Sequence, residues 1–325
     1  MTPLSGGAGG DILLLGAGGQ LGYELARVLP ELGSLTAWTR ADCDLANPAA
    51  AREKINAFAQ ARRPWLIVNA AAYTAVDRAE SETETARAVN AEIPGVLGGI
   101  AARTGALLTH YSTEYVFDGK SARPYRESDA PAPLNVYGQT KLEGERALLA
   151  SGARSLILRT SWVFGAHGGN FLKTMLRLAG ERDTLGVVAD QRGAPTSAAW
   201  LAQVTRLMLR RYRESQRAGQ GGLFRDGLYH LTAAGETTWH DYAAHIFSRA
   251  RQAGVALRLR PENLVALTSR EYKTPAARPE NSLLDNRLAL SVFGFSRPDW
   301  KEGVDAVLRE ILPAFPEGKP RAGEC

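Results

Sequence analysis

Short apolar runs alternate with longer amphipathic segments over the first half of the chain, and this alternation constrains the fold most. The first run, DILLLG, ends in glycines, and the segment after it carries Leu21, Leu25 and Leu29 at helical spacing. Apolar strands that alternate with amphipathic helices form a parallel sheet with helices on both faces. The sequence therefore predicts an α/β fold with a Rossmann-type, doubly wound parallel sheet.

The predicted elements follow one another as far as about residue 160 and then become less regular. Strands are predicted at 11–16, 34–38, 65–72, 106–112 and 155–165, and helices at 20–32, 48–61, 83–105 and 136–150. Later segments give a polar surface loop at 213–227, a strand at 226–232 that returns to the sheet, and a helix at 240–254. We expect a flexible tail over 1–10, a Rossmann domain over 11–160 completed by segments within 185–232, and a smaller, mainly substrate-binding lobe over 161–325.

The composition excludes several classes of protein. The chain has 325 residues and a formal net charge of +5, and its basic residues are spread along the sequence instead of forming a block. It has no run of about 18 apolar residues and no signal-peptide pattern. Its two cysteines, Cys43 and Cys325, predict neither a disulfide framework nor a thiolate metal site. We expect a cytoplasmic protein that binds neither nucleic acid nor membrane.

The segment LLLGAGGQLG places Gly16, Gly19 and Gly22 between a predicted strand and a predicted helix. Glycines at such a turn let the backbone approach a pyrophosphate, and the helix N-terminus supplies free N–H groups. The alternative is a plain strand-to-helix turn. The similar GGAGG at 6–10 follows no strand and is assigned to the tail. The first glycine loop therefore predicts a dinucleotide site.

The second predicted strand ends in AWTRADCDL, where a dinucleotide-binding protein recognises the adenosine ribose. Thr39 and Arg40 occupy the place where an acid would bind the 2′-hydroxyl of NADH. An arginine there suits a 2′-phosphate, which favours NADPH, although NADH stays possible and Arg40 could be simply solvated. Asp44 and Leu45 would border the adenine.

A tyrosine and a lysine in NVYGQTKLEGE lie four residues apart on a predicted helix, so Tyr137 and Lys141 share one face. A tyrosine becomes a useful acid when a nearby ammonium stabilises its phenolate. Ser112 and Thr113, at the end of a predicted strand, lie where ligands of an open α/β sheet bind. These residues, combined with the glycine loop, predict a site that reduces a carbonyl group.

In this combination the chain resembles the extended short-chain dehydrogenase/reductase family. Further strings of residues make the resemblance closer, and it runs from Asp11 to about Val307. These strings are VNAAAYTAVDRAE, HYSTEYVFDG, PLNVYGQTKLEGE, LRTSWVFG, NFLKTML, DQRGAPTS, GLYHLTAAGETTW and TPAARPENSLL. They are similar to those of family members that use NADPH to reduce the 4-ketone of dTDP-4-dehydro-L-rhamnose, giving dTDP-L-rhamnose. The resemblance also implies a homodimer.

The resemblance assigns a role to each site residue. Tyr137 is expected to donate the proton, Lys141 to lower the pKa of Tyr137 and bind the cofactor ribose, and Thr113 to bind the ketone. Substrate contacts are expected at Thr113, Glu114 and Trp162, although a lone tryptophan can equally be part of the core. The expected cofactor-binding residues are Gly16, Gly19, Gln20, Leu21, Gly22, Thr39, Arg40, Asp44, Leu45, Ala72, Tyr73, Thr74, Tyr111, Tyr137 and Lys141.

The chain departs from the family pattern at two places. The family usually has Ser-Thr-Asp-Tyr, and Glu114 stands here in place of the aspartate. Because a glutamate side chain is one methylene longer, its carboxylate is expected to contact the substrate in a different direction. Some relatives hold magnesium between subunits; Glu24 matches one of their ligands but another position is Ala199, so no obligatory metal is expected. The histidines show no ligand spacing and are expected to be structural or solvated. They are His110, His167, His230, His240 and His245.

Other functions remain open from the sequence. Sugar-nucleotide dehydratases need two carboxylates after the threonine, and Tyr115 follows Glu114 here, so elimination of water is disfavoured. Epimerases use similar hydride chemistry, and only the strings in the second lobe argue against them. A non-catalytic alternative is a regulatory subunit that resembles the methionine adenosyltransferase β subunit and binds NADP.

Overall fold

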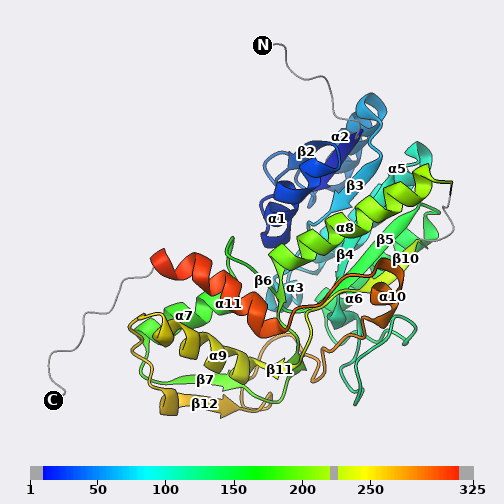
Figure 1. Cartoon of the computed structure of the whole chain (residues 1–325). Helices are drawn as coiled ribbons and strands as arrows, with labels where there is room; N and C mark the ends of the chain where they lie inside the picture. Colours follow the sequence, from blue (N-terminus) through cyan, green and yellow to red (C-terminus); the bar gives the residue numbers. More distant parts are fainter. Residues whose placement is uncertain (1–9, 220–225, 315–325) are drawn as a thin grey trace, which may run out of the picture.

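The computed structural model describes residues 10–219 and 226–314, so the predicted N-terminal tail lies almost wholly outside the described residues. Its centre is a six-stranded sheet in the order β10-β5-β4-β3-β1-β2, in which all neighbours are parallel. This arrangement confirms the predicted α/β class (Figure 1). The strands are β1 Asp11–Leu15, β2 Ser34–Trp38, β3 Leu66–Asn69, β4 Leu107–Thr113, β5 Ser155–Thr160 and β10 Gly227–His230.

Helices cover both faces of this sheet because alternate strand residues point to opposite sides. Ile12 and Leu14 of β1 pack with one group of helices, and Leu13 and Leu15 pack with the other. The first group is α1 Gln20–Val28, α8 Ala198–Arg217 and α10 Arg287–Phe293, and Figure 1 shows α8 lying across the sheet. The second group is α2 Pro48–Arg62, α5 Ile93–Thr104 and α6 Val136–Ala150.

A second lobe has its own apolar core, in which Leu172, Tyr242, Trp300 and Val304 are buried. It contains α7 Phe171–Glu181, α9 Trp239–Gln252, α11 Trp300–Ile311 and the parallel pair β7 Leu185–Val188 and β12 Leu264–Leu267. Figure 1 places these elements together below and to the left of the sheet. Short ladders between the lobes are β6 Val163–Phe164 with β9 Thr196–Ser197, and β8 Arg192–Gly193 with β11 Thr237–Thr238.

The chain passes between the two cores repeatedly, because elements of both are interleaved in the sequence. The passages lie at β5–β6, β9–α8, β10–β11, β12–α10 and α10–α11. The remaining short elements are η1 Leu29–Glu31, α3 Val76–Ala79, α4 Thr83–Arg87, η2 Ala88–Glu92, η3 Glu114–Val116, η4 Pro261–Asn263 and η5 Leu312–Ala314.

Three sequence-based predictions need correction. The single strand predicted at 155–165 is wrong, because β5 ends at Thr160 and Trp162 adopts φ 48°, which turns the chain out of the sheet. The surface loop predicted at 213–227 is wrong over 213–217, where α8 continues to Arg217, and residues 220–225 lie outside the described part. The single helix predicted at 83–105 is divided by the π-helix η2.

Candidate active site

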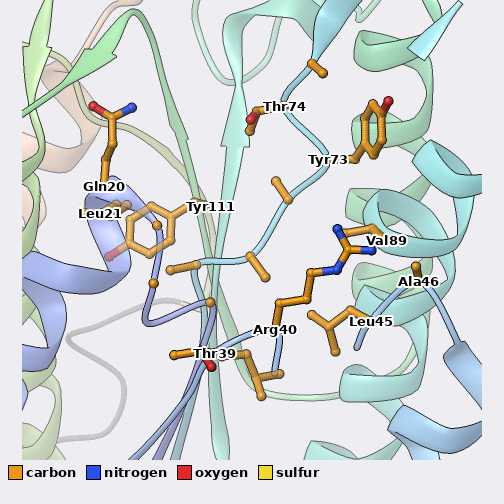
Figure 2. Close-up of a pocket in the computed structure, with 18 of the residues that line it drawn as sticks. Gln20, Leu21, Thr39, Arg40, Leu45, Ala46, Tyr73, Thr74, Val89 and Tyr111 are labelled. Atoms are coloured by element: carbon orange, nitrogen blue, oxygen red, sulfur yellow. The ribbon is translucent and has the colours of Figure 1, made fainter. Parts of the chain in front are cut away.

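A cavity of about 1040 Å³ opens at the carboxyl ends of β1, β2, β3 and β4. Figure 2 shows side chains from the glycine loop, from the end of β2 and from the segment after β3 around it. Most predicted cofactor residues line this cavity: Gly16, Gly19, Gln20, Leu21, Thr39, Arg40, Asp44, Leu45, Ala72, Tyr73, Thr74, Tyr111, Tyr137 and Lys141. The sheet therefore brings together residues that are more than 120 positions apart in sequence.

The glycine loop joins β1 to α1 in a tight turn. Gly16 and Ala17 donate backbone hydrogen bonds to the Trp38 carbonyl at 2.9 and 3.0 Å, which fixes the loop against β2. A Cβ at Gly22 would overlap with the Gly16 carbonyl, so only glycine allows the helix to start this close to the strand. The N-cap residue Gly19 has no side chain to accept the first N–H groups of α1. These donors suit a pyrophosphate, and the loop fits a dinucleotide.

The end of β2 carries the two predicted ribose-recognition residues and one that the sequence did not indicate. Asp42 accepts hydrogen bonds from the backbone N–H and the hydroxyl of Thr39, each at 2.8 Å, and these bonds lower the pKa of its carboxyl. Arg40 is 82% exposed, and its Nε lies 3.4 Å from Asp44 Oδ1. The guanidinium is thus largely exposed at the cavity, beside the exposed carboxylate of Asp44.

The segment after β3 is held by an asparagine of the π-helix η2. Asn90 accepts a hydrogen bond from the Tyr73 N–H at 2.9 Å and donates to the Tyr73 carbonyl at 3.1 Å. Its amide also donates to Thr140 of α6 at 3.3 Å. Single π-turns within helices often mark functional sites. Here the turn fixes the backbone at Tyr73, where a cofactor contact is expected.

Tyr137 and Lys141 lie in the first turns of α6, which begins after Asn135. The Asn135 side chain accepts from the Gly138 N–H at 2.8 Å and so caps the helix. The Lys141 nitrogen is buried, donates to the Tyr111 carbonyl at 2.6 Å and lies 3.3 Å from His110 Nε2. Burial lowers the pKa of Lys141 to about 8.

The expected lowering of the Tyr137 pKa by Lys141 does not appear in this structure. The pKa of Tyr137 is raised, first by burial and then by the nearby Glu114 carboxylate, and a hydrogen bond with Thr113 only partly opposes this shift. Lys141 instead directs its nitrogen at Tyr111 and His110. The tyrosine is therefore a protonated acid at neutral pH, and the lysine is not yet acting on it.

Thr113 and Glu114 meet at the end of β4, next to Tyr137. The Thr113 hydroxyl donates to Glu114 Oε2 at 2.7 Å and accepts from the Tyr115 N–H at 3.2 Å. Glu114 is buried, and this burial raises the pKa of its carboxyl to about 8. The side chain that replaces the usual aspartate is thus a neutral acid at pH 7.

The buried carboxyl of Glu114 predicts a pH-dependent stability. An acid whose pKa is raised on folding keeps its proton between about pH 4.5 and 8 in the folded state, whereas the unfolded chain loses it. Stability therefore falls as the pH rises through this window, and we expect Glu114→Gln to remove roughly 3 to 5 kcal/mol of that loss. Urea denaturation should give similar stabilities at pH 4.5 but a more stable variant at pH 9. A difference of the same size at both pH values would contradict this account.

Trp162 is not among the residues that line the cavity, although its neighbour Val163 is. Its indole stacks on Trp239 at a ring distance of 3.6 Å, and a Cβ at Gly193 would overlap with it. The space at Gly193 and the stack on Trp239 accommodate the indole, and with it the unfavourable φ of Trp162. The structure thus places Trp162 at the edge of the second lobe. Its predicted substrate contact stays a prediction.

A loop of the second lobe contacts the glycine loop, which the sequence did not reveal. His167 stacks on Tyr23 of α1 at 4.3 Å and donates from Nε2 to the Gly18 carbonyl at 3.2 Å. Asn170 donates to Gln20 Oε1 at 2.9 Å. Gly168 and Gly169 of the same loop also line the cavity. Asn170 opens the string NFLKTML, but neither that string nor His167 indicated a contact with the glycine loop, so only the fold could identify it.

The described residues offer little for a metal ion. They contain no group of three or more histidine, cysteine, aspartate or glutamate side chains that could bind one. Glu24 is buried and lies 3.3 Å from the Arg27 guanidinium, and Ala199 stands in the first turn of α8.

Within the described part of the chain, no helix combines the length and the apolarity needed to cross a bilayer.

The chain is similar to known proteins over most of its length. The model of the RmlD substrate-binding domain matches residues 10–312. The dTDP-4-dehydrorhamnose reductase of Escherichia coli K12 is 47% identical over 306 residues, which cover 93% of this chain and 98% of that protein. The chain belongs to the dTDP-4-dehydrorhamnose reductase family.

Two further members of this family agree with the assignment. The dTDP-4-dehydrorhamnose reductase of Burkholderia thailandensis is 44% identical over 93% of this chain and 99% of the relative. The crystal structure of dTDP-4-dehydrorhamnose reductase from Bacillus anthracis in complex with NADP has a TM-score of 0.80 at 32% identity, covering 93% of this chain and 99% of that one. Membership of the dTDP-4-dehydrorhamnose reductase family confirms the resemblance inferred from the motifs. It supports the reductase interpretation and not the regulatory-subunit alternative.

Proposed function

We propose that this chain uses NADPH to reduce the 4-keto group of dTDP-4-dehydro-L-rhamnose, giving dTDP-L-rhamnose. One observation carries the proposal: a single cavity is lined by the glycine loop together with Tyr137 and Lys141. A dinucleotide held by its pyrophosphate at the loop would extend towards the tyrosine. The family relationship supplies the keto-sugar, since the relatives are dTDP-4-dehydrorhamnose reductases.

In the proposed reaction, bound NADPH supplies a hydride to C4 of the sugar. The Tyr137 hydroxyl gives its proton to the ketone oxygen, so that the C=O double bond becomes a secondary alcohol. Thr113 binds the same oxygen as charge develops on it. Lys141 stabilises the resulting phenolate and binds the cofactor ribose. The proposed cofactor-binding residues are the predicted ones that line the cavity, together with Gly22 behind the loop.

The second lobe is proposed to bind the nucleotide sugar. Glu114 and Trp162 are proposed to be among the residues that contact the sugar. Glu114 lies beside Thr113 and Tyr137, where the ketone would be held. Trp162 brings a large flat ring to the edge of the second lobe, where it stacks on Trp239. We also propose that residues 161–325 mainly form this lobe and that no metal is required.

The direct test is oxidation of NADPH by the purified protein with dTDP-4-dehydro-L-rhamnose. We expect turnover that depends on both compounds and yields dTDP-L-rhamnose. If NADPH binds but no turnover occurs with this or any related keto-sugar, the non-catalytic alternative would be favoured. If NADPH does not bind, the assignment of the cavity is wrong.

Arg40 is expected to set the preference for NADPH. An arginine binds a 2′-phosphate through charge-assisted hydrogen bonds, and an aspartate would repel it and accept from the 2′-hydroxyl of NADH. We expect Arg40→Asp to lower the ratio of kcat/KM for NADPH to that for NADH by about tenfold or more. Arg52→Asp, on the exposed surface of α2, makes the same charge change outside the cavity and serves as control. A ratio that falls equally in both variants would remove Arg40 from this role.

We further propose that the protein is a cytoplasmic homodimer, as the family resemblance implies. Sedimentation analysis at several concentrations would test the dimer. A monomer over the whole concentration range would contradict it. Fractionation of the cells that produce the protein would test its location.

A further inference from the structure

A row of hydrogen-bonding groups runs behind the cavity from β3 to the lysine of α6. The Ala71 N–H donates to Asn69 Oδ1 at 3.2 Å, and Asn69 Nδ2 lies 3.1 Å from His110 Nδ1. His110 Nε2 then lies 3.3 Å from Lys141 Nζ. Asn69, His110 and Lys141 are each about 1% exposed. Water therefore has little access to these contacts, and the protein groups must satisfy one another.

The first bond in the row decides where the imidazole carries its proton. Since Asn69 Oδ1 accepts from the Ala71 N–H, the amide nitrogen must face His110, and an amide nitrogen only donates. His110 Nδ1 must then accept, so a neutral ring carries its hydrogen on Nε2. The ring does stay neutral, because burial holds the pKa of His110 well below its usual value. The Nε2–H group therefore points at Lys141.

This orientation favours the uncharged form of the lysine. An ammonium has three donors and no acceptor, so His110 Nε2–H would face it donor against donor. A neutral amine has a lone pair that can accept from Nε2–H while one of its own N–H groups donates to the Tyr111 carbonyl. Only the neutral lysine satisfies both contacts.

The charged groups around Lys141 do not reverse this preference. Glu145 lies one turn further along α6, and its charge raises the pKa of Lys141, but burial has the larger effect. Both Glu145 oxygens accept hydrogen bonds from Arg159 of β5, at 2.8 and 2.6 Å. Tyr137, one turn earlier on α6, is protonated. Among the described residues, the hydrogen-bond partners of the Lys141 nitrogen are therefore Tyr111 and His110.

We propose that His110, oriented by Asn69, is a positioning residue that favours the neutral amine of Lys141 in the cofactor-free protein, and that at alkaline pH Lys141 takes up one proton from solvent when NADPH binds. The second half rests on the proposed function. Hydroxyl groups of a cofactor ribose can accept hydrogen bonds from an ammonium, and Lys141 lines the cavity that would hold them. At alkaline pH the lysine would thus become the charged helper of Tyr137 when the cofactor binds.

The first half is tested by titration of the lysine itself. The chain has only seven lysines, so labelling their ε-carbons with ¹³C gives a simple NMR spectrum in which Lys141→Met identifies the Lys141 signal. We expect Lys141 to titrate near pH 8, well below the usual range of a lysine. His110→Gln should raise the pKa of Lys141 by about one unit, because a glutamine can turn its amide oxygen to the ammonium.

A second variant shows whether the pKa of Lys141 rises because of hydrogen-bond direction or because the packing is loosened. Asn69→Ala frees His110 to carry its proton on Nδ1 and to accept from the lysine at Nε2, so the pKa of Lys141 should rise although Asn69 does not touch the lysine. When added to His110→Gln, it should produce no further rise, because Asn69 acts through His110. An unchanged pKa in His110→Gln, additive shifts in the double variant, or a wild-type Lys141 that titrates in the usual range of a lysine would overturn the proposal.

Proton uptake by Lys141 on NADPH binding is tested with the wild-type protein, and Lys141→Met serves as its control. Calorimetric titration with NADPH at pH 9, in two buffers of different ionisation enthalpy, measures the protons taken up on binding. We expect close to one proton per NADPH for the wild type and none for Lys141→Met. NADPH binding without proton uptake in the wild type would overturn this half. Absence of NADPH binding would overturn the proposed function as well, while the NMR titration would still decide the state of Lys141 in the free protein.

Discussion

Tyr137→Phe is expected to abolish turnover while NADPH still binds. The variant lacks the hydroxyl that gives its proton to the ketone oxygen, and a positioned general acid typically contributes about 10²- to 10⁴-fold to a rate. The ring itself is retained, including its edge-to-face contact with Tyr115 at 5.5 Å. We therefore expect kcat to fall by about a thousandfold. The dissociation constant of NADPH, followed by nicotinamide fluorescence, should change little.

Tyr115 provides a matched control for this substitution. It packs against Tyr137, and burial raises the pKa of its hydroxyl as well. Tyr115→Phe removes the same kind of hydroxyl at a neighbouring position and leaves the proposed proton donor in place. We expect this variant to keep most of its activity. Equal losses in the two variants would indicate a general disturbance of the site, and unchanged turnover in Tyr137→Phe would remove Tyr137 from the mechanism.

Arg159→Met is expected to destabilise the protein by about 3 to 5 kcal/mol. Arg159 of β5 and Glu145 of α6 form a two-bond ion pair in which the side chains are only 3% and 2% exposed. The guanidinium also lies over the Phe117 ring at 4.9 Å, a contact that a methionine can partly replace. Removal of the arginine leaves the Glu145 carboxylate buried without its counter-ion. Urea denaturation near neutral pH should show this loss as a lower midpoint with little change in slope.

An exposed pair offers the corresponding control. Arg177 and Glu181 are joined at 2.8 Å on the surface of α7, with side chains 59% and 54% exposed. Arg177→Met should change the stability by no more than about 0.5 kcal/mol. The double variant Arg159→Met with Glu145→Met should recover most of the loss, because a buried pair replaced by apolar residues of similar volume is often neutral. A cost for Arg159→Met no larger than that for Arg177→Met would show that the buried pair is not needed for stability.

The elements of the sheet and the glycine loop could be predicted because their signals are local. Apolar runs, helical spacing and glycines such as Gly22 indicate structure that depends on residues nearby in sequence. The helix predicted at 136–150 is confirmed with both of its ends. The strand predicted through Trp162 failed for the opposite reason. Its left-handed turn is stabilised by Trp239 and by the space at Gly193, which are distant in sequence. No pattern around residue 162 records those contacts.

In the candidate site, too, local features were predictable from the sequence and long-range contacts were not. The sequence indicated Tyr137, Lys141 and Thr113 as residue types at meaningful positions, but not which way each side chain would face. Asn69 and His110 pair across a separation of 41 residues, and His110 and Lys141 across 31. Those contacts depend on the order of strands in the sheet. A histidine that looked purely structural therefore became the neighbour of the proposed catalytic lysine.

The repeated passage of the chain between its two cores restricts how the molecule can move. Two lobes joined by one linker can swing apart like a hinge, but here several strands and loops tie them together at β5–β6, β9–α8, β10–β11, β12–α10 and α10–α11. Each passage would have to bend in step with the others, which makes large rotations costly. A substrate is therefore expected to enter through small loop movements at the mouth of the cavity. For the same reason, neither lobe should fold when expressed by itself.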